Sequence, residues 1–474
     1  MTKAPSVKYA KGSGRGRVQG SSKHNMSAVI QPGAQAPLAS IAFGDAGRAI
    51  VFDARGDVPL ETFLAQVRGV AATLPAARHA INLCEDRYRF LVAFCAVALR
   101  GQVNLLPPSR APAAVDEAMA QHPDSYCIGD MALAPAPERY LRLPDALPER
   151  IGEVPMLDDD ALVAIGYTSG STGRPHANPK TWGSFRRSTA QNLAALGDLW
   201  PEGDAHIVAT VPPQHMYGME MSVLLPLLGP VAVHAARPFF PEDVAQALAH
   251  ASAPRILVTT PVHLRALLVS GCVLPPLRAI VSATAPLPVE LAIQAEQRYG
   301  CEVREVFGST ETCVIARRRT ACEIAWTPLP GVRVAPQPDG TAVHAPHLAT
   351  PVVLADLVEV DADGRFVLRG RHADLLEIAG KRASLGDMTR KLLAIPGVED
   401  GVVFQMDTPG EGGVCRIAAL AVAPTLEESA ILAALRRTID PVFLPRPLRR
   451  VAALPRNETG KLPRELLAGL LQAP

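Results

Sequence analysis

Short apolar runs alternate with amphipathic stretches along the chain, from about residue 46 to residue 307. Short apolar runs predict buried strands, whereas apolar residues spaced three and four apart predict helices that bury one face. Strands are predicted at 79–84, 103–107, 161–167, 255–260, 277–282 and 301–307, and helices at 60–74, 87–101, 262–271 and 289–299. This alternation is typical of parallel βαβ units. It predicts a layered α/β fold with ligand-binding loops at the carboxyl ends of the strands.

The pattern changes near residue 356. Residues 356–371 predict a hairpin that turns on Asp361-Ala362-Asp363-Gly364, and smaller units follow, with helices at 385–395 and 427–439 and strands at 401–406 and 416–422. We therefore predict a large N-terminal domain over residues 31–369 and a small α+β C-terminal domain over residues 370–474.

The first 30 residues are rich in Gly, Ser and Lys, and the first acidic residue of the chain is Asp45. This composition predicts a disordered basic tail at residues 1–30. Such a tail could tether the chain to an anionic partner. The favoured alternative is a solvated extension, or a chain that truly begins at Met26.

Composition and charge narrow the function classes. Hydrophobic residues make up 48% of the chain and charged residues 20%, which is typical of a globular protein. A net charge of +1 gives no bulk attraction to nucleic acid or to an anionic membrane. The longest apolar run, residues 222–236, is interrupted by prolines and is shorter than the roughly twenty residues of a membrane-spanning helix. The 8 cysteines form no CxxC pair, and no secretory signal is recognisable, so we expect a cytoplasmic protein with reduced thiols.

The predicted strand at 161–167 leads into a loop rich in glycine and hydroxyl side chains, Thr168-Ser169-Gly170-Ser171-Thr172-Gly173. Glycines allow a tight turn that exposes backbone N–H groups, and the hydroxyls add further donors for phosphate oxygens. The loop lacks the GxxxxGK[ST] pattern, which disfavours a P-loop nucleotide hydrolase.

Two further motifs combine with this loop. At the end of a later strand, Val306-Phe307-Gly308-Ser309-Thr310-Glu311 places an aromatic ring beside a hydroxyl and a carboxylate, and a carboxylate can bind Mg²⁺. Near the C-terminus, Lys461 follows a glycine in a predicted loop. Lysine is rare in this chain, with 8 lysines against 39 arginines, so each lysine of the folded part deserves separate consideration.

These three motifs, in this order and spacing, resemble the adenylate-forming superfamily, which includes acyl- and aryl-CoA synthetases, the adenylation domains of peptide synthetases and firefly luciferase. The resemblance covers about residues 45–474. It implies a large N-terminal domain and a small C-terminal domain that rotates as a mobile lid. It also implies that ATP activates a carboxylic acid to an acyl-adenylate with release of pyrophosphate, after which a thiol accepts the acyl group.

The resemblance implies a set of ATP-binding residues. The phosphates would be held by Thr168, Ser169, Gly170, Ser171, Thr172 and Gly173, adenine by Phe307, and the ribose by Asp356 and Arg371. Thr310 would contact the α-phosphate, Glu311 would bind Mg²⁺, and Lys461 would reach between the carboxylate and the α-phosphate, where negative charge develops.

The resemblance also implies an acyl pocket. His215 and Tyr217 lie in a segment similar to the family's His-containing loop, and His215 would have a pocket or gating role, although a lone histidine is often structural. The segment 281–287 resembles a pocket wall in which glycines are frequent where Ala283 and Thr284 stand. The implied lining residues are His215, Tyr217, Ala283, Thr284, Ala285 and Gly308. The extra side chains favour a compact aryl acid such as a hydroxybenzoate, unless they point into the core. Glycine at both positions should lengthen the pocket and loosen the strand end.

The chain departs from the family pattern beside the phosphate loop. His176 stands where the family usually has lysine, and Lys180 follows four residues later. The sequence leaves open whether either residue compensates. At the predicted hinge, Ala373 and Glu377 also replace frequent Asp and Lys, a departure that bears on the rotation and not on the adenylation.

The expected acceptor is the phosphopantetheine thiol of an acyl carrier protein or of CoA. Residues 436–464 carry eight basic and two acidic side chains, a local charge of +6 that suits an anionic partner. This patch and the altered loop favour an aryl acid:acyl carrier protein ligase of the aryl-polyene type. Two alternatives stay open: a CoA synthetase that uses an aryl or a fatty acid, and a non-catalytic relative that only binds nucleotide or carrier protein.

Overall fold

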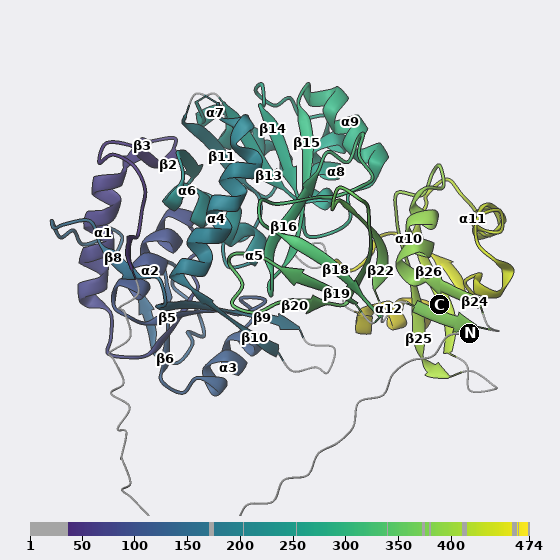
Figure 1. The fold of residues 1–474 in the computed structure, drawn as a ribbon, viewed down its shortest axis with the longest axis horizontal. Helices are drawn as coiled ribbons and strands as arrows, with labels where there is room; N and C mark the ends of the chain where they lie inside the picture. Colours follow the sequence, from purple (N-terminus) through teal and green to yellow (C-terminus); the bar gives the residue numbers. More distant parts are fainter. Residues whose placement is uncertain are drawn as a thin grey trace, which may run out of the picture. The chain divides into compact units, whose positions relative to one another are not determined.

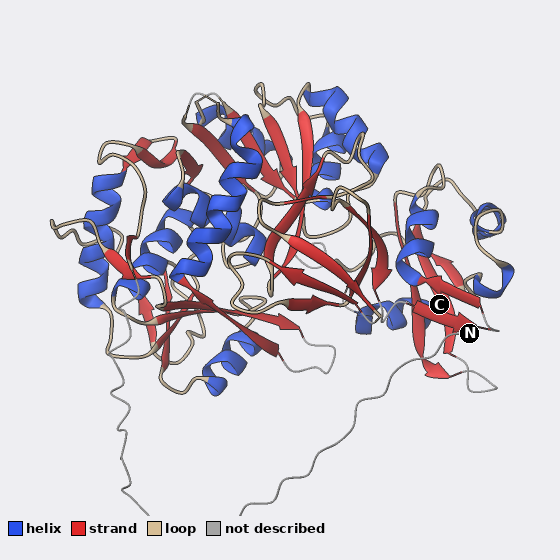
Figure 2. Cartoon of the chain, viewed as in Figure 1, coloured by secondary structure: helices blue, strands red, loops and turns tan. Residues whose placement is uncertain are grey.

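The computed structural model describes residues 37–169, 175–201, 203–252, 254–338, 340–371, 375–378, 381–409, 415–456, 462 and 464–472. The predicted tail at residues 1–30 lies outside the described residues, as do Gly170, Ser171, Thr172, Gly173 and Lys461. Figure 1 traces the chain, and Figure 2 shows helices layered against strands.

A largely parallel sheet forms the centre of the described N-terminal part (Figure 1). Nine described strands lie in the order β17-β16-β15-β14-β13-β11-β12-β2-β3, and the neighbours from β2 to β15 pair in parallel, whereas β3, β16 and β17 pair antiparallel. The strands are β2 (Ala49–Asp53), β3 (Gly56–Pro59), β11 (Ala205–Ala209), β12 (Val231–His234), β13 (Arg255–Thr259), β14 (Ala279–Ser282), β15 (Glu302–Ser309), β16 (Cys313–Arg318) and β17 (Thr327–Pro328).

A second mixed sheet has the order β10-β9-β5-β4-β6-β7 among the described strands. Its strands are β4 (His79–Asn82), β5 (Val103–Leu106), β6 (Ser125–Gly129), β7 (Tyr140–Arg142), β9 (Leu162–Ser169) and β10 (Pro175–Thr181). Smaller sheets pair β1 (Leu38–Ser40) with β8 (Met156–Asp158), β18 (Arg333–Gln337) with β19 (Gly340–His344) and β20 (Val352–Leu354), and β21 (Asp356–Val360) with β22 (Phe366–Arg371).

Helices connect the parallel strands and cover the sheets. In the described N-terminal part they are α1 (Leu60–Thr73), α2 (Arg87–Leu99), α3 (Pro112–Gln121), α4 (Trp182–Leu196), η1 (Gly197–Leu199), α5 (Met216–Met219), η2 (Glu220–Leu224), α6 (Leu225–Leu228), α7 (Pro241–His250), α8 (Pro261–Ser270) and α9 (Val289–Tyr299). No helix among the described residues has the length and apolar character to cross a bilayer.

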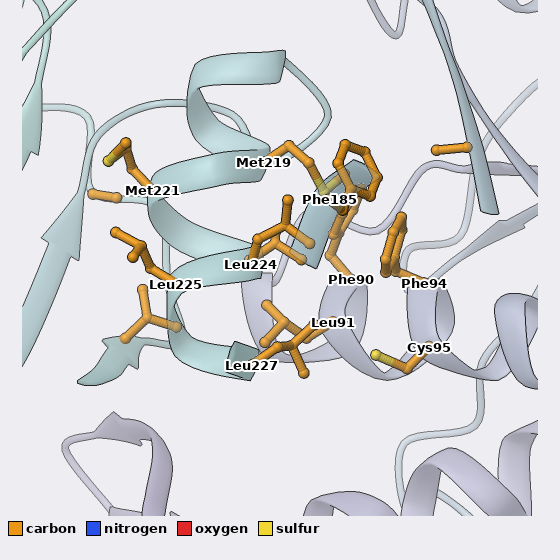
Figure 3. Close-up of a cluster of buried hydrophobic side chains, with 14 of the residues drawn as sticks. Phe90, Leu91, Phe94, Cys95, Phe185, Met219, Met221, Leu224, Leu225 and Leu227 are labelled. Carbon is orange, nitrogen blue, oxygen red and sulfur yellow. The ribbon is translucent and has the colours of Figure 1, made fainter. Parts of the chain in front are cut away.

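The buried core joins distant parts of the chain. Figure 3 shows Phe90, Leu91 and Phe94 of α2 near Leu224 and Leu227 of the helical stretch 216–228. Aliphatic and aromatic side chains on two helix faces bury apolar area against each other, which is the main driving force for such packing. The helical stretch that follows His215 is therefore anchored in the core.

The C-terminal part has small elements with hydrophobic clusters of their own. Its described elements are β23 (Leu375–Ile378), β24 (Lys381–Ser384), α10 (Leu385–Leu393), β25 (Asp400–Pro409), β26 (Cys415–Val422), α11 (Glu428–Leu435), η4 (Pro441–Phe443), β27 (Leu448–Arg450) and α12 (Arg464–Gln472). The predicted α/β class with parallel sheets is confirmed. The domain boundary at 369/370 and the mobility of the C-terminal domain stay predictions.

Candidate active site

The carboxyl ends of several strands carry the predicted site residues. Thr168 is near the end of β9, Ala283 directly follows β14, and Phe307 lies near the end of β15. His215 follows β11 and directly precedes α5. Loops at the carboxyl ends of strands in an open α/β sheet are where ligands usually bind.

Gly166 in β9 is the point where three of these segments meet. A Cβ atom added to Gly166 would lie 2.7 Å from Thr310 Cγ2 and 3.4 Å from Met216 Cε. Only glycine lets the Thr310 methyl approach this strand so closely. Gly166 therefore places the strand that leads into the phosphate loop against the turn after β15 and against the segment that contains His215.

The register of β10 against β9 determines which residues of β10 share a sheet face with Gly166. His176 pairs with Thr168, Asn178 with Gly166, and Lys180 with Ala164. Directly opposed residues of an antiparallel pair share a face of the sheet. His176 is exposed and lies opposite the phosphate-loop residue Thr168, whereas Lys180 is 3% exposed.

Lys180 contacts the turn that carries the predicted catalytic residues. Its Nζ donates a 2.8 Å hydrogen bond to the carbonyl oxygen of Glu311. The turn is also closed internally, since the Ser309 N–H donates to Thr312 Oγ1 at 3.2 Å and the Thr312 N–H donates to Ser309 Oγ at 3.2 Å. The sequence marks Lys180 as one of the few lysines of the folded part, but it does not predict the contact between Lys180 and this turn.

Buried polar side chains support the same turn from behind. His347 Nε2 donates to the Thr312 carbonyl at 2.6 Å, and the Val314 N–H donates to Glu220 Oε2 at 2.9 Å. Burial raises the pKa of Glu220, and hydrogen bonds from Ser188, Val314 and Asn192 oppose that rise. No local pattern predicts this support, because the partners of Glu220 and His347 are distant from them in sequence.

The segment before His215 is held by Arg87, whose side chain is fully buried. Its guanidinium donates to the carbonyls of Ala209 and Val211 at 2.7 and 3.2 Å, and also to Ser222 Oγ. Burial lowers the Arg87 pKa to about 9. Arg87 therefore fixes both ends of the segment that presents the half-buried His215.

The predicted pocket residues have different surroundings. The Tyr217 hydroxyl donates to the Val281 carbonyl at 2.8 Å, so it ties α5 to β14, and the side chain is buried in the main hydrophobic cluster. Ala283 is 7% exposed and belongs to the main hydrophobic cluster, which favours a core role for its methyl group. Ala285 is half-buried.

Thr284 is unusual in its backbone. Its φ is 81°, a left-handed conformation that is strained for a β-branched residue. Its hydroxyl oxygen is buried without a hydrogen-bond partner among the described residues, as is that of Ser282. A buried hydroxyl without a partner is costly, so a ligand group that bonded to it would gain free energy.

Gly308 allows β15 and β16 to pack closely. A Cβ atom added there would lie 2.1 Å from the Cys313 carbonyl oxygen. The register of β15 with β16 shifts between Phe307 and Gly308. Glycine is therefore required for backbone packing at this bulge, and its predicted pocket role stays a prediction.

The predicted adenosine-binding residues also gather in one region. The Phe307 ring centroid lies 5.4 Å from that of Trp326 and 6.0 Å from that of Phe366 in β22. Asp356 and Arg371 are directly paired across β21 and β22, although the side chain of Arg371 lies outside the described part, as does that of Ser169. One hairpin thus brings both predicted ribose contacts together.

The donor set near Glu311 fits a magnesium ion that is held mainly by phosphate oxygens and water. The described residues contain no group of three or more His, Cys, Asp or Glu side chains that could hold a metal. Mg²⁺ in nucleotide sites commonly takes one or two protein carboxylates together with substrate phosphates. The half-buried Glu311 side chain can supply one such ligand.

Known proteins resemble this chain in sequence and in fold. The model of the AMP-binding enzyme family matches residues 68–374. The chain is 30% identical to a 4-coumarate–CoA ligase of Rhodobacter capsulatus over 305 residues, which cover 63% of this chain and 74% of the relative. It is 26% identical to a 3-hydroxybenzoate–CoA/4-hydroxybenzoate–CoA ligase of Thauera aromatica over 402 residues, 75% of each chain. The crystal structure of ATP-bound MatB from Rhodopseudomonas palustris has a TM-score of 0.75 at 21% identity, and the match covers 91% of this chain and 97% of that one.

The fold and the matched region define an adenylate-forming enzyme. This chain belongs to the AMP-binding enzyme family. The predicted superfamily and the predicted class, an AMP-forming ligase, are confirmed. The individual site residues stay predictions.

Proposed function

We propose that this protein uses ATP to convert a compact aryl acid, such as a hydroxybenzoate, into an acyl-adenylate and pyrophosphate, and then transfers the acyl group to the phosphopantetheine thiol of an acyl carrier protein. The observation that carries the proposal is the convergence at Gly166, where the strand of Thr168, the turn of Thr310 and the segment of His215 meet. Three segments that carry chemically different predicted groups thus adjoin one strand, which supports the joining of ATP to a carboxylate there.

Each group has a role in this reaction. Thr168 and the following loop would hold the phosphates, and the Thr310 hydroxyl would donate to an oxygen of the α-phosphate. Mg²⁺, when bound with ATP, neutralises phosphate charge, and Glu311 would hold it. The ammonium of Lys461 would stabilise the negative charge that develops as pyrophosphate leaves. A binding module would not need this carboxylate and this lysine together, which argues against a non-catalytic relative.

The strand end after β14 supports a compact acid. Thr284 carries a hydroxyl and a methyl group where the family often has no side chain, so the wall is bulkier there. The partnerless Thr284 hydroxyl oxygen would suit a polar substituent such as a phenolic hydroxyl. The names of two relatives, which contain coumarate and hydroxybenzoate, point to the same class of acid.

The acceptor has two candidates. The basic segment 436–464 favours an acidic carrier protein, although in its described part Arg456 pairs with Asp400 at 2.6 Å and Arg450 with Glu427 at 3.5 Å. Free CoA is the second candidate, because the relatives are named as CoA ligases.

A direct competition between acceptors tests the proposal. Acyl-adenylate formed from radiolabelled 4-hydroxybenzoate is offered holo-carrier protein or CoA, and the thioester products are quantified. The proposal predicts faster loading of the carrier protein. The double variant Arg436→Glu/Arg437→Glu, at two exposed positions, should raise the KM for carrier protein by roughly tenfold and leave pyrophosphate exchange unchanged.

The exposed Arg100, which lies outside the basic segment, provides the matched control Arg100→Glu. Faster transfer to CoA, with no effect of the double charge reversal, would assign the enzyme to the CoA ligases. Activation of long-chain fatty acids in preference to aryl acids would overturn the substrate part of the proposal.

A further inference from the structure

Lys180 lies in the interior next to the predicted catalytic turn. Lys180 belongs to β10 and is 3% exposed, and its ammonium donates a hydrogen bond to the Glu311 carbonyl at 2.8 Å. A hydrogen bond from a charged donor is stronger than one between neutral groups. Because this bond fixes the peptide group that follows Glu311, it limits how the backbone of the turn can rotate.

A buried ammonium requires compensation of its charge. Glu220, which is 1% exposed, lies within electrostatic reach of Lys180. The Glu220 carboxylate is in turn held by Ser188 Oγ at 2.6 Å and Asn192 Nδ2 at 3.0 Å, both from α4, and accepts the Val314 N–H at 2.9 Å. Lys180 therefore holds the turn at Glu311, and Glu220 holds the chain just beyond the turn at Val314.

The position of Lys180 distinguishes it from a phosphate ligand. A lysine that attracts ATP phosphates should reach toward solvent beside the phosphate loop, whereas Lys180 is enclosed and bonded to the backbone. The residue that lies beside that loop is His176, which is exposed and pairs with Thr168 across β9 and β10. Lys180 therefore does not take over the phosphate-binding role of the lysine that His176 replaces.

We propose that Lys180 is a positioning residue that fixes the 309–312 turn so that Thr310 and Glu311 are aligned for adenylation. This inference rests on the proposed function for its catalytic part. Misplacement of a reacting group by about 1 Å can cost a reaction roughly 100-fold in rate. Loss of the hydrogen bond from Lys180 should therefore lower the rate of the chemical step and leave the affinity for ATP nearly unchanged.

The test compares Lys180→Met with the parent enzyme in acid-dependent pyrophosphate exchange. We expect kcat to fall by roughly 10- to 100-fold and the KM for ATP to change by less than about threefold. The double variant Lys180→Met/Glu220→Gln removes the uncompensated carboxylate. It should regain thermal stability relative to Lys180→Met but stay as slow.

A matched control separates positioning from general destabilisation. Thr189 Oγ1 donates to the Phe185 carbonyl within α4 at 2.8 Å, so Thr189→Val removes a buried bond that does not reach the turn. Thr189→Val should lose stability but keep kcat. A tenfold rise in the KM for ATP of Lys180→Met at unchanged kcat would make Lys180 a phosphate ligand and overturn the inference, as would a kcat within twofold of the parent value.

Hydrogen exchange provides a readout that does not depend on activity. In ligand-free Lys180→Met, the backbone amides of residues 309–314 should exchange at least about tenfold faster than in the parent, and those in Thr189→Val should not change. If the parent enzyme exchanges no pyrophosphate with any acid, the proposed function fails, and the amide rates still decide whether Lys180 fixes the turn. Unchanged rates in Lys180→Met would refute that role.

Discussion

At the residue scale, Lys461 has the largest catalytic role that the family resemblance implies. Lys461→Ala should lower the rate of adenylate formation by roughly 10²–10³, the usual effect of removing one preorganised charge-stabilising group. Thiol transfer from supplied acyl-adenylate should be much less affected, because rotation of the C-terminal domain would carry Lys461 away after the first step. Single-turnover measurements of both half-reactions check this, and equal losses would count against the rotation.

His234 gives a residue-scale prediction about pH and stability. Burial lowers the His234 pKa to about 4. Its Nδ1 accepts the Ala236 N–H at 3.2 Å, which requires an unprotonated Nδ1, and the side chain packs edge-on against Phe52. The folded state therefore favours neutral His234, while the unfolded chain binds a proton near pH 6.5.

The sign of the effect follows from linkage. The stabilisation is present above about pH 6.5 and is lost as pH falls toward 4, by up to about 3 kcal/mol in total. His234→Asn keeps an acceptor for Ala236 and should flatten the decline of the urea unfolding free energy between pH 6.5 and 4.5. His176→Asn, at an exposed histidine, is the control. An unchanged slope in His234→Asn would show that other groups cause the acid sensitivity.

At the element scale, α4 shows why part of the site could not be predicted. The helix carries a polar stripe of Ser184, Ser188, Gln191 and Asn192, and from the sequence alone such a stripe indicates a solvent-facing surface. In the structure these side chains bond to His347, Glu220 and the Pro330 carbonyl. Their partners are distant in sequence, so no local pattern could reveal them.

The end of β14 gives a second element-scale prediction. Ala283→Gly with Thr284→Gly should extend activity toward longer acids by tens to hundreds of fold in relative efficiency, because each methylene-sized group discriminates by about 1–3 kcal/mol. Efficiencies across a series of acids of increasing length check this. A double variant that folds and keeps the parental length profile would show that these side chains do not bound the pocket.

The structure changes the stability expected of the two single variants. The sequence predicted that both glycines would loosen the strand end, but the φ of 81° at Thr284 reverses the sign there. Thr284→Gly relieves left-handed strain and should stabilise the protein by roughly 1 kcal/mol, whereas Ala283→Gly removes a buried methyl and should cost about as much. Thermal unfolding of each single variant separates the two effects.

At the scale of the whole molecule, hydrophobic periodicity predicted part of the parallel sheets: β13, β14 and β15 of the large sheet and β4, β5 and β9 of the second. The predicted helix at 289–299 is α9 (Val289–Tyr299), and the predicted hairpin at 356–371 is β21 with β22. Among the elements that were missed are helices α3, α4 and α7 and strands β2, β6, β10, β11 and β12. Strand β10 contains two prolines and two charged or titratable residues in Pro175–Thr181, so its sequence resembles a loop until β9 pairs with it.

Charge at this scale was harder to predict from the sequence. The basic segment 436–464 has a local charge of +6 when counted by itself, but Asp400 and Glu427, which pair with Arg456 and Arg450, lie outside it. Ion pairs between elements therefore lower the charge that a partner would meet. Counting charges within a segment overstates its field whenever the fold brings in opposite charges.

Exchange of labelled pyrophosphate into ATP tests the central claim most directly, because exchange requires reversible formation of the acyl-adenylate. The purified protein should catalyse exchange that depends on both Mg²⁺ and a carboxylic acid, with compact aryl acids such as hydroxybenzoates giving the highest rates. Folded protein that binds ATP but exchanges no pyrophosphate with any acid of a broad aryl and aliphatic panel would contradict the account.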